Sequence, residues 1–482
     1  MPNPKETERT EQALSALFTR PARMAETCAD RLVCFMAYCS LTQRAGTTAL
    51  NLSRCGGLPA LAAAFGEALP TGGAETEEQA APLVEAAFGC LNAVCSSWET
   101  ENPVLGDALT AFLPYIPHDA DLYRHLASLT GLLNTYLAEP PEQAPDFLLS
   151  CLNTALTDPE SVAFDTPEGI CRLFRALAES HIATLPAGYT VYDPCCGSGR
   201  LVAAMVQNGE KRVFGKDMLA AVRPFFLVRN LLAGNTGAAF SLGDSIASPL
   251  TSESEPAALQ TFDLVVSQPP FGFCPNAVQH LAEDPFHRFV RGVPRRNSGD
   301  WLHICNMLAH AEQERGMVMV LGIKATLFRV DISAQLRRCL TEENLPDAVI
   351  SLPQGVLAPY TGIAPALLIF RNGRRRRGIR FIQAASAGTK ERRSTLLTEA
   401  DIDRIRRAYE SDETEPGFAR TVDAAELAAN EWTWEVSAYV SPRGEAAAPA
   451  PSAEEMQAEI ASLRTQLQEK QQRLAALLAL FH

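Results

Sequence analysis

Between residues 160 and 385 the chain alternates two patterns: short runs rich in β-forming residues, and stretches with apolar residues at helical spacing. This alternation predicts an α/β fold with a mostly parallel sheet, because parallel strands need a crossover that is usually a helix. Helices are expected around 219–233, 300–314 and 332–340. In an open sheet of this kind, ligands bind beyond the carboxyl ends of the strands. The expected strands are YTVYD, KRVFGKD, AAFSLGD, FDLVVS, GMVMVLGI, DAVISL and ALLIFR.

The segments before residue 159 have a different pattern. Helical periodicity with few strand signals predicts a helical N-terminal domain over residues 1–158. A proline-rich stretch, EPPEQAPD at 139–146, indicates a break near its end. The α/β domain is then expected over 159–390.

Three further segments follow the α/β domain. A tail region at 391–442 contains a helix expected at 398–410. A Pro/Ala-rich linker at 443–453 leads to a last helix at 454–482, whose apolar residues follow a heptad frame. This narrow apolar stripe predicts a coiled-coil helix. Pairing with another chain and packing back onto its own chain are equally compatible with the pattern.

Composition excludes several classes of protein. With 47% hydrophobic and 20% charged residues the chain is globular, and its longest apolar runs are shorter than the ~20 residues of a membrane span. The charged N-terminus has no secretion signal, so a cytoplasmic location is expected. None of the 13 cysteines forms a CxxC pair, and zinc is not expected.

The net charge of −14 opposes nonspecific attraction to nucleic acid. Contact with DNA would therefore need local basic patches or a partner subunit. One arginine cluster, at 288–296, follows the proline pair described below and is the better candidate for phosphate contact. A second cluster occupies 371–380. For both, a solvated turn is the simpler interpretation.

The run VYDPCCGSG at 191–199 fits a strand that ends in an acidic, glycine-rich turn. Gly197 and Gly199 would let backbone N–H groups approach a cofactor that a Cβ atom would exclude. Asp193, Asp217 and Asp244 end three consecutive strands, and Asp217, about 20 residues past the turn, is placed to accept both hydroxyls of a ribose. Each carboxylate alone is often a helix cap, but three in register predict a nucleoside cofactor.

The run DLVVSQPPFG at 263–272 places an amide and an aromatic ring on a stiff, proline-locked loop at a strand end. Gln268 and Phe271 are suited there to hold an extruded base. A dinucleotide enzyme is the alternative for the glycine turn. It is disfavoured because the turn reads PCCGSG rather than GxGxxG and because such an enzyme has no use for QPPF.

These motifs also carry a resemblance. FDTP at 164–167, YDPCCGSG, FGKD, GDS at 243–245 and SQPPFG occur in the order and spacing of an amino-methyltransferase. From about 160 to 442 the chain resembles the modification subunits of type I restriction-modification systems, a family of N6-adenine DNA methyltransferases. The resemblance implies a Rossmann-like methyltransferase domain that uses S-adenosyl-L-methionine, acts on DNA in a hetero-oligomer and joins a specificity subunit, with a restriction subunit as a further possible partner.

The resemblance also implies the site residues. In the family, the first motif residue and the carbonyl of the next proline accept the two N6 hydrogens, which are the roles of Gln268 and Pro269 here, and Phe271 would stack on the base. Pro270 completes the catalytic loop. The implied cofactor-binding residues are Phe164, Thr166, Pro167, Asp193, Pro194, Cys195, Gly197, Ser198, Gly199, Asp217, Asp244 and Ser245.

The sequence departs from the family at two informative positions. The family has Asn, Asp or Ser where this chain has Gln268, and one added methylene displaces the acceptor oxygen enough to slow a reaction by ~100-fold. A catalytically impaired subunit with an assembly or DNA-clamping role is therefore the alternative function. Arg200 stands where Gly is common and is expected to face solvent. His303 and His310 are expected to be structural rather than metal ligands.

A third function, methylation of a protein glutamine or of RNA by a similar proline loop, is disfavoured by the large helical domain and by the tail.

Overall fold

The predicted linker and coiled-coil helix lie outside the residues that the structure describes, as do Phe164, Arg295 and Arg296. The computed structural model describes residues 4–19, 32–36, 103–116, 120–139, 165–206, 212–235, 237–272, 281–294, 298–374 and 376–440, with short pieces between 85 and 96 and between 141 and 151.

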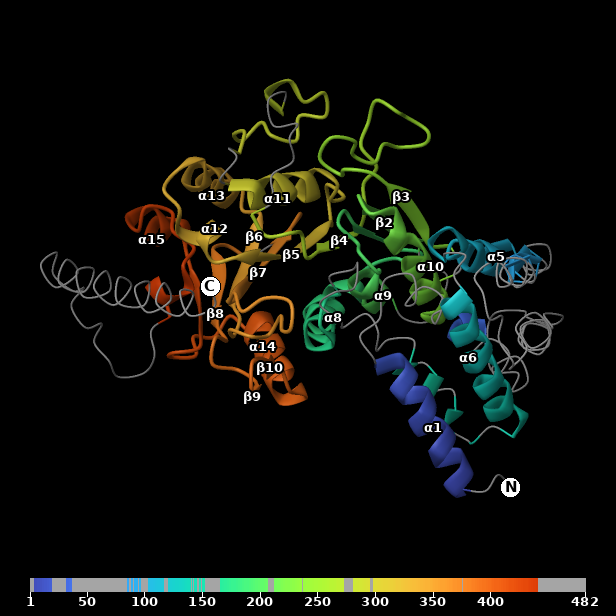
Figure 1. Cartoon of the computed structure of the whole chain (residues 1–482). Helices are drawn as coiled ribbons and strands as arrows, with labels where there is room; N and C mark the ends of the chain where they lie inside the picture. Colours follow the sequence, from blue (N-terminus) through green and yellow to red (C-terminus); the bar gives the residue numbers. More distant parts are fainter. Residues whose placement is uncertain are drawn as a thin grey trace, which may run out of the picture.

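Nine strands of the described chain form one sheet, in the order β11-β8-β6-β7-β5-β4-β1-β2-β3 (Figure 1). Neighbours from β3 to β5 are parallel, β7 is antiparallel to both β5 and β6, and β11 is antiparallel to β8. The strands are β1 (Thr190–Asp193), β2 (Arg212–Asp217), β3 (Ala239–Leu242), β4 (Leu264–Ser267), β5 (Met317–Ile323), β6 (Pro346–Ser351), β7 (Pro365–Arg371), β8 (Ile379–Gln383) and β11 (Ala419–Val422).

All seven predicted strands are present, and the predicted α/β class with a mostly parallel sheet is confirmed. The sequence analysis did not predict β8 and β11. Because β11 belongs to the tail and pairs with β8, the tail adds a strand to the edge of the central sheet. A separate hairpin of β9 (Thr389–Glu391) and β10 (Ser394–Leu396) lies between them in the chain.

Helices cover both faces of the sheet (Figure 1). Successive strand residues alternate between two apolar cores: Val191 packs with α8, α9 and α14, and Tyr192 packs with α11 and α13. The helices after the first break are α8 (Glu168–Ile182), α9 (Arg200–Ala204), η3 (Ala220–Val222), α10 (Arg223–Leu232), α11 (Gly299–Ala309), α12 (Ala325–Phe328), α13 (Ile332–Glu342), α14 (Glu399–Glu410), α15 (Ala424–Ala429) and η6 (Val436–Ala438).

Two predicted helices illustrate how local chemistry sets their ends. A capping box between Thr398 and Asp401 starts α14 where the sequence indicated. The helix predicted at 300–314 ends earlier, at Ala309, because the carbonyl of His310 accepts a hydrogen bond from the Phe262 backbone N–H, at 2.8 Å, just before β4.

The described part of the N-terminal region is helical and packs against α10. Phe225, Val228 and Leu231 on one face of α10 join the apolar core of these helices, while Phe226 on the other face joins the sheet core. Arg223 adds an ion pair to Asp107, with N–O distances of 2.8 and 2.9 Å. The N-terminal helices are α1 (Pro4–Thr19), α5 (Pro103–Thr110), η1 (Leu113–Tyr115) and α6 (Ala120–Ala138). None of the described helices has the length and apolar character needed to cross a bilayer.

Candidate active site

The two sequence motifs meet at the carboxyl end of the sheet, where β1 and β4 are neighbours. Asp193, the last residue of β1, is buried, and its Oδ1 accepts hydrogen bonds from Ser267 Oγ at 2.7 Å and from the Cys195 backbone N–H at 2.9 Å. Burial raises the pKa of Asp193 to about 7, although both hydrogen bonds oppose the rise. Asp193 therefore joins the glycine turn to the residue directly before Gln268.

Both glycines of the turn have positive φ angles, +49° at Gly197 and +77° at Gly199. The need for glycine at 199 is also steric, since a Cβ there would lie 2.7 Å from a ring carbon of Phe226 on α10. At Gly197 the backbone N–H donates to Asp217 Oδ2 at 2.9 Å. The turn is thus fixed by α10 on one side and by the end of β2 on the other.

Asp217 ends β2 with its side chain partly exposed. Its two oxygens accept the N–H groups of Gly197 and Leu219, each at 2.9 Å, and each oxygen keeps a second lone pair for a ribose hydroxyl. The next residues, Met218 and Leu219, are apolar but 55% and 49% exposed, which suits the face of a purine. The sequence analysis missed these two, although apolar residues directly after the acid were the available signal.

The third acid, Asp244, caps the backbone of the turn that follows it, which is the common role of a lone carboxylate at a strand end. Its Oδ1 accepts the backbone N–H groups of Ile246 at 2.8 Å and Ala247 at 3.2 Å. Ser245 beside it is buried. Asp244 and Ser245 therefore shape the loop after β3.

A buried ion cluster links the turn to residues 165–167 and corrects the prediction for Arg200. Asp165 is buried and accepts a hydrogen bond from Ser198 Oγ. Arg200 and Arg229 each approach Asp165 Oδ2 at 3.3 Å, and Arg200 also pairs with Glu168 at 2.9 Å. Only 17% of the Arg200 side chain is exposed, so it does not face solvent. Arg200 holds residues 165–167 against the turn.

The remaining predicted residues of that segment lie directly beside the cluster. Thr166 is buried, and its carbonyl lies 3.7 Å from Cys171 Sγ. Pro167 precedes α8 and its carbonyl accepts the first backbone hydrogen bonds of the helix.

The QPPF loop leaves β4 with one acceptor unpaired. Gln268 Oε1 is buried and has no hydrogen-bond partner among the described residues. Pro269 is buried and Pro270 is exposed. Phe271 is partly buried and packs against the apolar core that the sheet forms with α8, α9 and α14. A buried amide oxygen without a donor costs free energy, so this arrangement is suited to accept the N–H group of a substrate.

The loop has an anchor that the sequence analysis did not identify. Asp300, in the first turn of α11, is buried, and its Oδ1 accepts the Gly272 backbone N–H at 3.3 Å. Burial raises the pKa of Asp300. The acid in NSGDW was the available signal, but its partner lies 28 residues away in the chain.

His303 lies beside the glycine turn, with Nδ1 3.6 Å from Cys195 Sγ. Burial lowers its pKa to about 4, so the imidazole is neutral near pH 7. His310 is buried as well, with Nδ1 2.7 Å from the carbonyl of Gln260. Within the described residues, no group of three His, Cys, Asp or Glu side chains is arranged to hold a metal ion.

The two described arginines of the cluster after the proline pair, Arg288 and Arg291, form ion pairs within the protein. Arg288 is buried and pairs with Asp284 at 2.7 Å and with Asn306 at 3.0 Å. Arg291 binds Glu343, with N–O distances from 2.6 to 2.9 Å. Both guanidinium groups therefore have carboxylate partners within the protein, and phosphate contact by this cluster stays a prediction.

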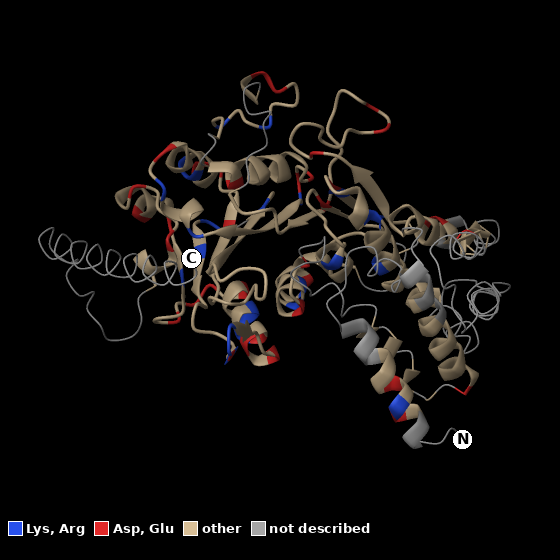
Figure 2. Ribbon diagram, viewed as in Figure 1, with Lys and Arg blue, Asp and Glu red and all other residues tan. Residues whose placement is uncertain are grey.

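Two members of the second arginine cluster also turn inward. Arg374 pairs with Asp347 at 3.1 Å, and Arg380 donates to the carbonyls of Ala408 and Glu413 at 2.8 and 2.6 Å. Figure 2 shows basic and acidic residues interspersed over the described elements rather than gathered by sign. The described fold thus offers no broad basic face to DNA.

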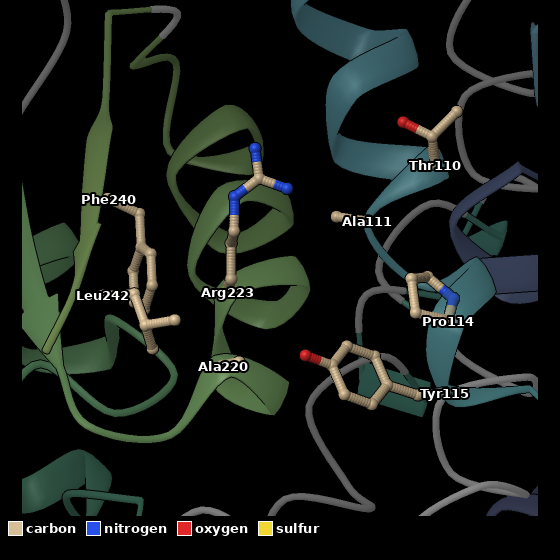
Figure 3. Close-up of a pocket in the computed structure, with 8 residues that line it drawn as sticks. All are labelled: Thr110, Ala111, Pro114, Tyr115, Ala220, Arg223, Phe240 and Leu242. Atoms are coloured by element: carbon tan, nitrogen blue, oxygen red, sulfur yellow. The ribbon is translucent and has the colours of Figure 1, made fainter.

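A separate pocket of about 210 Å³ lies between the N-terminal helices and the edge strand β3 (Figure 3). Phe240 and Leu242 form one wall, and Pro114 and Tyr115 form the opposite one. No predicted site residue lines this pocket.

Comparison with known proteins identifies the family. The sequence model of the N-6 DNA Methylase family matches residues 147–447, more than half of the chain. The chain belongs to this family. It is 29% identical over 273 residues to the type I restriction enzyme MjaVII methylase subunit of Methanocaldococcus jannaschii, covering 52% of this chain and 45% of that protein. It is 24% identical over 303 residues to the MpnII methylase subunit of Mycoplasma pneumoniae, covering 58% and 53%.

The chain thus spans about half the length of these curated relatives. The predicted resemblance to type I modification subunits is confirmed. A solved type I methyltransferase subunit from Streptococcus thermophilus superposes with a TM-score of 0.65 at 18% identity, covering 90% of this chain and 99% of that one. A chain from a type I restriction-modification assembly gives 0.62 at 16%, covering 98% of both. These structures confirm the predicted methyltransferase fold. The domain boundaries and the terminal coiled coil remain predictions.

Proposed function

We propose that this chain transfers a methyl group from S-adenosyl-L-methionine to N6 of adenine in DNA, as the modification subunit of a type I restriction-modification complex. The observation that carries the proposal is the buried, unpaired Oε1 of Gln268 at the end of β4. It lies next to Ser267, which binds the same Asp193 carboxylate as the glycine turn. An amine acceptor and a cofactor turn are thus joined through one side chain.

The residues present fit the cofactor. Asp217 offers two carboxylate oxygens to a ribose, and the exposed Met218 and Leu219 offer an apolar face to the adenine ring. When bound, the sulfonium cofactor supplies an electrophilic methyl group. The neighbouring Asp165 cluster fixes Thr166 and the turn so that this side of the site is formed in advance.

On the substrate side the chain positions and polarises the amine. Gln268 Oε1 and the carbonyl of Pro269 accept the two N6 hydrogens, which directs the nitrogen lone pair toward the methyl donor. Phe271 stacks on the extruded base, a contact typically worth ~1–3 kcal/mol. Asp300 holds the end of this loop through Gly272, so the acceptors do not drift.

The proposed partner subunits follow from the low intrinsic affinity of this chain for DNA. With a net charge of −14, and with Arg288 and Arg291 after the QPPF loop paired internally, intrinsic affinity for DNA is low. We therefore assign sequence recognition to a specificity subunit, joined through the coiled-coil helix predicted at 454–482 in a hetero-oligomer, with a restriction subunit where the system encodes one. A cytoplasmic location goes with this role.

One observation favours a second function. Gln268 replaces the family's shorter side chain, and misplacing the acceptor by about an ångström can lower a rate by ~100-fold. A subunit that binds the cofactor but transfers no methyl group would contribute assembly or clamping of DNA instead.

A glutamine series separates the two functions. The complex purified with the specificity subunit is assayed for labelled methyl transfer to DNA as wild type, Gln268→Asn and Gln268→Ala. We expect Asn to match or exceed wild type, and Ala to lose ~100-fold or more. Gln383→Asn is the matched control. Gln383 also has a buried Oε1 without a partner among the described residues, but this residue ends β8, which is not a neighbour of β4 in the sheet. Activity in the Ala variant equal to wild type contradicts the proposed role of Gln268. No transfer by either wild type or the Asn variant, with cofactor binding retained, supports the assembly function.

A further inference from the structure

Three apolar side chains stand out into solvent on the segments 289–292 and 324–331. Phe328 is 51% exposed, Val330 83% and Val290 71%. We call these three residues the apolar rim. Exposing large apolar side chains together is unfavourable and marks an interaction surface when the backbone is fixed.

The backbone under Phe328 and Val330 is fixed by a buried arginine. Arg337 on α13 donates to the carbonyls of Thr326 at 3.0 Å, Arg329 at 2.8 Å and Trp432 at 2.7 Å. The carbonyl of Leu327 accepts the Trp434 backbone N–H at 2.7 Å. The turn is therefore held by α13 and by the tail, and the two side chains have a defined direction outward.

The segment that carries Val290 packs against the start of α13, the helix that directly follows this turn. A Cβ on Gly292 would lie 2.8 Å from Ile332 Cδ1, and Gln335 Nε2 donates to the Arg291 carbonyl at 2.9 Å. Ile332 begins α13 two residues after Val330. The three members of the rim thus belong to two segments that are both anchored to α13.

The rim lies on the same side of the molecule as the carboxyl ends of β4 and β5, where the QPPF loop leaves the sheet. Strands β4 and β5 are parallel neighbours, so the turn after β5 and the QPPF loop after β4 leave the sheet at the same end. Asp300 binds Gly272 at the end of the QPPF loop. Burial raises the pKa of Asp300, and Arg329 is close enough to oppose part of that rise. The rim and Phe271 therefore lie on loops at the same end of the sheet, the end to which a duplex would deliver a base.

We propose that the apolar rim contacts the DNA duplex at the gap left by the extruded adenine and stabilises the unstacked state. The inference rests on the proposed function. Apolar side chains inserted at a base step are a known means of offsetting the cost of unstacking. Lys324 lies on the same turn and adds a positive charge beside the rim for flanking phosphates, while the charge of Arg329 is shared with Asp300 and Asp331. This chemistry favours nucleic acid over a protein partner as the occupant.

The test compares paired and pre-opened targets. The complex with the specificity subunit carries Phe328→Ala and Val330→Ala together, and kcat/KM for methyl transfer is measured on a duplex bearing the mapped recognition site. A second duplex has an abasic position opposite the target adenine, which lowers the cost of extrusion. We expect a loss of about 10-fold or more on the paired duplex and near wild-type activity on the abasic one.

The matched control is Leu396→Ala, whose side chain is 51% exposed on the β9–β10 hairpin. It should leave both rates unchanged. Calorimetric cofactor binding equal to wild type shows that the double variant is folded. Equal losses on both duplexes, no loss on either, or loss of the specificity subunit during purification each overturns the inference, the last by identifying a protein contact. Absence of transfer by the wild type refutes the proposed function itself, and this inference with it.

Discussion

Replacing Asp165 with Asn will destabilise the methyltransferase unit more than removing either of its arginine partners. The substitution keeps the shape and the acceptor for Ser198 Oγ but removes the charge. Arg200 and Arg229, only 17% and 12% exposed, then lose a shared counterion. Breaking a buried pair by removing one partner typically costs about 3–5 kcal/mol. Arg200→Met should cost only about 1 kcal/mol, because Asp165 keeps Arg229 and Ser198.

Urea unfolding followed by tryptophan fluorescence measures this difference. Trp301 and Trp434 are buried together in the core beneath α11, with ring centroids 6.0 Å apart, so they report on the sheet and its helices. The control is Arg338→Met, which removes an exposed pair with Glu342 and should change the free energy of unfolding by less than about 0.5 kcal/mol. An Asp165→Asn cost below about 1 kcal/mol, or an equal cost for Arg200→Met, refutes the account of this cluster.

Three further predictions follow from the packing of the site. Gly199→Ala should lower the free energy of unfolding by about 2 kcal/mol or more, because its Cβ would meet the Phe226 ring at a positive φ; an unchanged urea midpoint contradicts this. Burial raises the pKa of Asp193 from 3.8 to about 7, so its protonated form stabilises the native state fully below about pH 4, and that contribution is lost as pH rises through 7. The stability of Asp193→Asn relative to wild type should therefore increase between about pH 4 and 7, and a constant difference would oppose the assignment. Arg337→Met should cost about 3 kcal/mol, measured by the same unfolding assay, because three backbone carbonyls, that of Trp432 among them, lose a buried donor; a cost within about 0.5 kcal/mol would show that water replaces it.

Much of the fold could be predicted because its central strands are buried on both faces. Continuous apolar runs such as those of β4 and β5 have few alternatives to a central parallel strand. The missed strands lacked this signal. β8 follows an arginine-rich run and contains Arg380, which is buried and donates to two carbonyls, and β11 has only four residues with an arginine among them. Their place in the sheet depends on pairing across about 40 residues, which no local pattern encodes.

The site divides in the same way. The positions of Asp193 and Asp217 were predictable because the carboxyl ends of parallel strands lie at the same end of the sheet. Asp165 and Arg200 were not, because an ion pair across 35 residues depends on how α9 and the 165–167 segment pack. Charged residues are normally exposed, so sequence alone favoured solvent for Arg200. The exposed position of Phe328 likewise depends on where Arg337 anchors the turn.

The most direct test of the central claim is nucleoside analysis of DNA from cells that express this chain together with its specificity subunit. Mass spectrometry should find N6-methyladenine confined to one recognition sequence, and none when Gln268→Ala replaces the wild type. Methylation at another position of the base, or N6-methyladenine that persists unchanged in the Gln268→Ala variant, would contradict the assignment of β4 and its loop as the site of transfer.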